Sequence, residues 1–87
     1  MTMQDRITER LRQTLNPLAL EVVNDSHLHA GHHGSPGTGE SHFRVMIVSA
    51  HFAGLSRIDR HRLVNEALET ELKLGIHALA IKAEAPG

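Results

Sequence analysis

Apolar residues recur at every fourth position near the start of the chain. Met3, Ile7, Leu11 and Leu15 fall on one side of a helix with 3.6 residues per turn, and charged residues fill the positions between them. Such a pattern is typical of an amphipathic helix that packs one face against a core. Asn and Pro follow at positions 16–17 and are expected to end this helix.

Two segments further along have the patterns of β-strands. Residues 19–24 are rich in β-branched side chains, which favour strands. Residues 41–49 alternate apolar Phe43, Val45 and Ile47 with more polar neighbours, and this period of two is typical of a half-buried strand. The two strands are expected to pair as a hairpin.

The longest helical pattern begins near Arg57. Ser56 and Asp59 have the spacing of a capping box, in which side-chain oxygens accept hydrogen bonds from unpaired amides at a helix start. The pattern continues to Lys73, and Gly75 supplies the left-handed residue that commonly ends a helix. The residues expected to pack on the core side are Ile58, Val64, Ala67, Leu68, Glu71 and Leu72.

A short apolar segment over residues 76–81 predicts a third strand, with His77 at its start. His77 shares its side of this strand with Leu79 and Ile81, so its imidazole is expected to point towards the apolar face. The resulting order is αββαβ. It predicts one α+β domain over residues 1–87, a small two-layer sandwich with both helices on one face of a three-stranded sheet.

Composition narrows the range of functions. The formal net charge is −1, so the chain has no overall positive field with which to hold nucleic acid. It has no cysteine, which excludes disulfides, thiol nucleophiles and thiolate metal sites built by this chain alone. We see neither an apolar signal segment nor a run of about 20 apolar residues that could cross a bilayer. We therefore expect a cytoplasmic protein without membrane contact.

Histidines are concentrated between the first two strands. Residues 25–40 combine four glycines with His27, His29, His32 and His33, which indicates a loop. Neutral imidazole is a good ligand for iron, copper, zinc and nickel. The alternatives are a solvated polar loop and a buffer for divalent metals that needs no partner. If the loop and the third strand's start share one end of the sheet, His77 and a loop histidine can converge on one metal centre.

A basic cluster opens the long helix. Arg57, Arg60, His61 and Arg62 could contact DNA phosphates or a protein partner. Acidic residues on the same helix, beginning with Asp59, limit the number of phosphate contacts. The alternative is a solvated, salt-bridged helix face, and of the two binding hypotheses we favour docking of a protein partner.

Ion pairs are expected further along this helix, and catalysis is not. Arg62 with Glu66, and Glu69 with Lys73, lie four residues apart and are predicted to pair. Glu69 and Glu71 are expected to lie on an exposed helix surface, which gives two carboxylates no catalytic environment. We therefore predict that the protein is not an enzyme.

Several short strings resemble the signature of the BolA family. They are Phe52 and Gly54, then Arg60-His61-Arg62, then His77-Ala78-Leu79-Ala80, with upstream support from Glu40-Ser41-His42-Phe43, Leu20-Glu21-Val22 and Asp25-Ser26. The resemblance covers nearly the whole chain. Many members continue into a further helix, so this sequence looks like a short form. The resemblance implies a fold similar to the type II KH domain, and some members are described as transcriptional regulators.

The resemblance also implies a cofactor and a partner. It implies that this protein is a monomer by itself and forms a heterodimer with a monothiol glutaredoxin of the CGFS type. In that heterodimer the two proteins and glutathione share a [2Fe–2S] cluster. His77 matches the family's fixed cluster ligand, and the second ligand is implied to be a loop histidine, His29 or His32 ahead of His33. Because this chain has no cysteine, the thiolates must come from the glutaredoxin and glutathione. DNA binding through the Arg57 to Arg62 segment is the alternative function.

Overall fold

The computed structural model describes residues 2–25 and 42–87. Helix α1 (Met3–Leu15) comes first, followed by strands β1 (Ala19–Asn24) and β2 (His42–Val48). A short 3₁₀ turn, η2 (Ala50–Phe52), leads to helices α2 (Arg57–Ala67) and α3 (Glu69–Leu74), and strand β3 (Ala78–Glu84) ends the fold.

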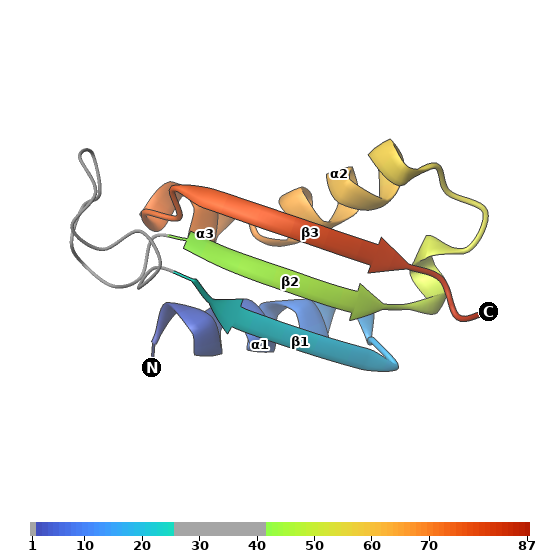
Figure 1. The fold of residues 1–87 in the computed structure, drawn as a ribbon, viewed down its shortest axis with the longest axis horizontal. Coiled ribbons are helices and arrows are strands. Elements are labelled where there is room, and N and C mark those ends of the chain that lie inside the picture. Colours follow the sequence, from blue (N-terminus) through green and yellow to red (C-terminus); the bar gives the residue numbers. More distant parts are fainter. Residues whose placement is uncertain (1, 26–41) are drawn as a thin grey trace.

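The three strands form one sheet in the order β1-β2-β3. β1 and β2 are antiparallel, and β2 and β3 are parallel because helices α2 and α3 carry the chain back to the end where β2 begins. The helices lie on one side of the sheet and leave its other face open (Figure 1). The predicted two-layer α+β architecture is confirmed.

The core lies between the sheet and the helices. Phe43, Val45 and Ile47 of β2 point into it, and the register places them beside the inward residues of β1 and β3. The helices contribute Ile7 and Leu11 from α1, and the core also includes Leu15, Val22, Phe52, Val64, Leu68, Ile76 and Ala83. The alternation expected from the sequence therefore identified the core face of β2.

Helix α1 starts with a complete capping box that the sequence analysis did not identify. The Thr2 hydroxyl accepts a hydrogen bond from the Asp5 amide, and the Asp5 carboxylate accepts one from the Thr2 amide, both at 3.1 Å. The Thr2 amide lowers the pKa of the Asp5 carboxyl below its usual value, because its hydrogen bond favours the ionised form. At the other end Asn16 is left-handed, with φ of 43°, and ends the helix where predicted.

The predicted single helix from Arg57 to Lys73 is wrong, because the chain bends at Leu68. That buried residue has φ of −100° and ψ of 16°, and it separates α2 from α3. Ile58 was expected in the core but is 70% exposed, because the first turn of α2 lies beside the outer edge of β3 rather than beneath the sheet (Figure 1).

Glu71 of α3 is buried, as its place among the core-side positions of the helical pattern predicts, and the expectation that it shares an exposed surface with Glu69 is wrong. Its carboxylate is 1% exposed and lies 3.5 Å from Arg6 Nη2 and 3.4 Å from Arg10 Nε on α1. Arg6 and Arg10 are partly exposed to water, and their positive charges compensate the buried negative charge of Glu71. This ion-pair network joins the first and last helices of the fold.

The expected surface pairs are only partly present. Lys73 Nζ lies 3.2 Å from the Glu69 carboxylate, as predicted. Arg62 instead contacts Asp59, with its Nη1 at 3.3 Å from Oδ1, so the prediction that it pairs with Glu66 is wrong. Asp59 lies one turn before Arg62 on the same face, so either acid is within reach of the guanidinium.

Candidate functional site

Two histidines meet at one end of the sheet. Because β2 and β3 are parallel, both begin at this end, and the register pairs His42 with Ala78. His77 immediately precedes β3, and its ring centroid lies 5.7 Å from that of His42, with 34° between the ring planes. His42 is half-buried and His77 is exposed. The arrangement offers two imidazoles at the surface within one small area.

The predicted orientation of His77 is wrong. Strand β3 begins at Ala78, one residue after His77, and Ile76 takes the buried position instead. The alternation of β3 does not extend to His77, because His77 and Ala78 are both exposed and Ala78 is the first residue of the strand. The imidazole is therefore directed to solvent, where a ligand or a partner can reach it.

A carboxylate beside the histidine pair is already engaged. Asp25 follows β1, and its amide donates a hydrogen bond to the carbonyl of His42 at 2.9 Å. The Asp25 carboxylate lies 3.3 Å from Nε of Arg44. Since Arg44 already pairs with this acid, the imidazole nitrogens of His42 and His77 are the better candidates for metal ligation here.

The predicted loop ligands His29, His32 and His33 lie outside the described residues. The residues that flank the loop, Asp25 and His42, are at the same sheet end as His77. Within residues 2–25 and 42–87, no group of three or more His, Cys, Asp or Glu side chains is placed to hold a metal ion. A metal centre at this end therefore needs ligands beyond those two histidines.

The sequence analysis did not select His42 as a site residue. It treated His42 as one of the outward positions of an alternating strand. His42 lies at the start of β2, and His77 lies just before the start of β3. If the two strands had been known to be parallel, their positions would have indicated that the two histidines are neighbours. Parallel pairing was the missing information, because an antiparallel partner would have placed the two histidines at opposite ends.

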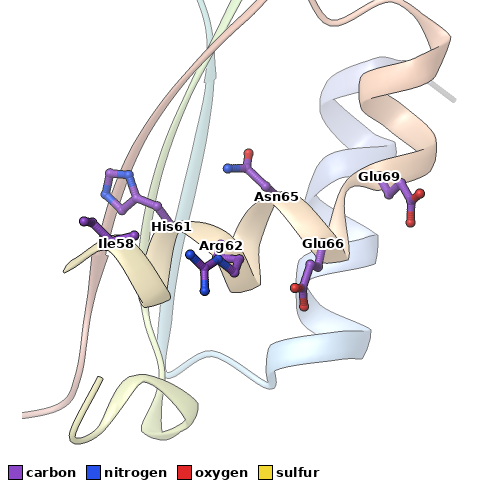
Figure 2. A pocket seen from close by; sticks show the side chains of 6 residues that line it. All are labelled: Ile58, His61, Arg62, Asn65, Glu66 and Glu69. Atoms are coloured by element: carbon purple, nitrogen blue, oxygen red, sulfur yellow. The ribbon is translucent and has the colours of Figure 1, made fainter. Parts of the chain in front are cut away.

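The predicted docking residues separate into two surfaces that share His61. Arg57, Arg60 and His61 line a groove of about 750 Å³ together with residues 81–87. An open hollow of about 570 Å³ on the outer side of α2 is lined by Ile58, His61, Arg62, Asn65, Glu66 and Glu69. Figure 2 shows His61 and Asn65 pointing to one side of α2, and Arg62 and Glu66 to the other. The basic cluster therefore does not form one flat surface.

No membrane-crossing helix is present in the part of the chain that the structure describes, since none there combines the necessary length with sufficient apolar content.

Comparisons with known proteins identify the family and agree with the fold. Residues 11–87 match the family model described as BolA-like protein. The chain is 51% identical over 88 residues to a Sinorhizobium protein described as an uncharacterized protein in the cobS 5′ region, covering 100% of this chain and 95% of that protein. It is 49% identical to mouse BolA-like protein 1 over 92% of this chain, and spans 56% of the mouse protein's length.

A solved structure has the same fold. The BolA domain of SufE1 from Arabidopsis thaliana superposes with a TM-score of 0.86 at 45% identity, covering 99% of this chain and 94% of that domain.

Proposed function

The chain belongs to the BolA-like protein family, and from this premise we propose that it is a non-enzymatic partner of a monothiol glutaredoxin. In the proposed heterodimer the two proteins and glutathione share a [2Fe–2S] cluster, and His77 is a ligand. Its role is in iron–sulfur cluster trafficking or in regulation by iron or redox state, and a cytoplasmic location remains our prediction.

The observation that carries this proposal is the exposed His77 imidazole beside His42. Iron–sulfur clusters accept imidazole in place of thiolate on one iron, which raises the reduction potential. The described residues supply nitrogen donors at this end, and the chain has no cysteine to supply sulfur. This donor set fits half of a mixed site whose thiolates come from the partner.

Each residue at this end has a proposed part. His77 presents its ring to the partner, and a second imidazole comes from His29, His32 or His33. His42 is an additional candidate, since its ring lies 5.7 Å from that of His77. When bound, the cluster supplies an iron–sulfur unit that can be reduced or transferred.

The experiment mixes the protein with a CGFS glutaredoxin, glutathione, iron and sulfide under anaerobic conditions. Visible absorption and circular dichroism of the mixture are compared with those of the glutaredoxin alone. We expect wild type to form a one-to-one complex with a changed cluster spectrum, and His77→Ala to abolish the change or accelerate cluster loss at least several-fold.

His51→Ala is the matched control, because His51 is exposed and lies in η2, at the opposite end of β2. His42→Ala and substitutions of the three loop histidines identify the second ligand. If His77→Ala gives the same cluster spectrum and lifetime as His51→Ala, His77 is not a ligand and the proposed site is wrong.

The DNA-binding alternative remains a prediction. Arg62 is paired with Asp59, and Arg57 and Arg60 line a groove whose other wall is formed by residues 81–87. The three arginines therefore do not form one basic surface, and no specific feature of the described structure favours duplex binding.

A further inference from the structure

The two outer strands of the sheet, β1 and β3, differ in whether the backbone groups on their outer edges have hydrogen-bond partners. On β1, the side-chain amide of Gln4 in α1 donates a hydrogen bond to the carbonyl of Val22 at 2.7 Å. This bond occupies one of the backbone groups that an edge strand otherwise presents to other chains. The β1 edge is therefore partly closed by the protein's own first helix.

The edge of β3 has no such closure among the described residues. The Ser49 amide donates to the Glu84 carbonyl at 3.0 Å, so Glu84 directs its backbone groups towards β2. Successive residues of a strand alternate in this direction, and the N–H and C=O of Ile81 and Ala83 therefore point outwards. Ala83 is only 5% exposed, whereas Ile81 is half-buried, so the accessible part of the edge is at Ile81 and beyond the strand's end.

A cationic groove runs along this edge. One wall consists of residues 81–87, and the other consists of Arg57, Arg60 and His61 on α2, enclosing about 750 Å³. Neither Arg57 nor Arg60 forms an ion pair with a described acid, in contrast to the Arg62–Asp59 pair on the same helix. Nε of Arg60 is closed to water and has no hydrogen-bond partner in the described structure, so packing holds this side chain in place.

These features favour an acidic occupant with an extended backbone. The chain has a net charge of −1, but Arg57 and Arg60 have no acidic partners among the described residues and make this groove locally positive. Such a groove attracts carboxylates. An open strand edge selects extended peptides, because their N–H and C=O groups match its spacing. Glu84 lines the groove, and its carboxylate opposes the continuous phosphate charge of a DNA duplex more than it opposes a few spaced carboxylates.

An apolar contact is available next to the groove. Ile58 is 70% exposed and lines the neighbouring hollow, which shares His61 with the groove. In Figure 2, Ile58 and His61 lie together at the start of α2. An apolar residue flanked by cations is a suitable anchor for a segment that carries one apolar and several acidic side chains.

We propose that the groove between α2 and β3 is a docking site for an acidic, extended segment of a protein partner. Carboxylates of the segment pair with Arg57 and Arg60, and its backbone lies along the outer edge at Ile81. The site is separate from the histidine pair and does not rest on cluster ligation, so it can be tested in the protein without iron, glutathione or glutaredoxin.

The test measures fluorescence anisotropy of a labelled peptide of about eight alternating Glu and Val residues, a length that matches the groove wall. A peptide of alternating Lys and Val and a short mixed-sequence DNA duplex serve as competing probes. We expect saturable binding of the acidic peptide only, and at least a ten-fold loss of affinity in Arg57→Glu/Arg60→Glu. Arg12→Glu is the control, because Arg12 is exposed on α1 and away from the groove, and its affinity should remain within two-fold of wild type.

A second measurement tests the position of the peptide. Amide hydrogen exchange should show the Ile81 N–H protected several-fold by the acidic peptide, with the amides of β1 unchanged. The proposal is overturned if Arg12→Glu weakens binding as much as the double variant, if Ile81 gains no protection, or if DNA binds the same arginines more tightly than the peptide. Variants at His77 should leave peptide binding unchanged, so failure here is distinguishable from failure of the cluster proposal.

Discussion

Two pairs of arginines on different helices have opposite surroundings. Arg6 and Arg10 of α1 direct their guanidinium groups at the buried carboxylate of Glu71. Arg57 and Arg60 of α2 have no acidic partner among the described residues and line an open groove. The first pair joins α1 to α3, whereas the second leaves two positive charges available at the surface.

The difference shows what a charged residue contributes in each place. The Glu71 carboxylate is 1% exposed and needs compensating positive charge, so removing Arg6 and Arg10 is expected to lower the free energy of unfolding strongly. Arg57 is exposed and Arg60 is half-buried, and neither has an acidic partner among the described residues. Their charges therefore contribute little to stability and remain available for binding. The stability and binding roles of these four arginines should therefore separate cleanly on substitution.

The largest effect is expected for Arg6→Ala/Arg10→Ala. This change leaves the Glu71 carboxylate buried without a counter-charge, and should lower the free energy of unfolding by about 3 to 5 kcal/mol. Urea denaturation measures it, with Arg12→Ala as the control on the same helix. Because a domain of this size has only about 4 to 13 kcal/mol of stability, Arg10→Ala alone is the fallback if the double variant does not fold. A loss below about 1 kcal/mol for the folded double variant would contradict the structural role.

An intermediate effect is expected for Glu71→Gln. The amide keeps the size of the side chain but loses the charge, and both arginines can still reach water. We expect a loss of about 1.5 to 3 kcal/mol, the range for a hydrogen bond to a charged group. Glu69→Gln, at an exposed position on the same helix, is the matched control in the same urea titration. Equal losses for the two variants would show that burial of Glu71 is unimportant.

The smallest effect on stability is expected for Arg57→Gln/Arg60→Gln. Glutamine keeps most of the side-chain stem, so the free energy of unfolding should change by less than about 0.5 kcal/mol. The same variant should lose most of its affinity for the acidic peptide, as measured by anisotropy. A stability loss comparable to that of Glu71→Gln would instead assign these arginines to the fold.

The sequence alone predicted the elements with strong local patterns. The period of four from Met3 to Leu15 identified α1, and the period of two at Phe43, Val45 and Ile47 identified the core face of β2. Such patterns depend on the positions of apolar side chains along one segment, so they do not require knowledge of the partners. The resemblance to the BolA family was also available from short strings and is confirmed by the family match.

Features that depend on distant contacts could not be predicted in this way. Glu71 has the composition of a surface helix around it, and only the position of α1 shows that two arginines meet its carboxylate. His42 and His77 are 35 positions apart in the chain, and their rings meet because β2 and β3 are parallel. The bend at Leu68 likewise lies inside a sequence that reads as one continuous helix.

By itself, the sequence determined the fold class, the core pattern, the absence of thiolates and the family. The tertiary structure decided which histidine lies beside His77 and which arginines are paired or left available. The physical reason is the range of the interactions. Burial of apolar side chains follows a local periodicity, whereas ion pairs, ring contacts and strand edges depend on which segments the chain brings together.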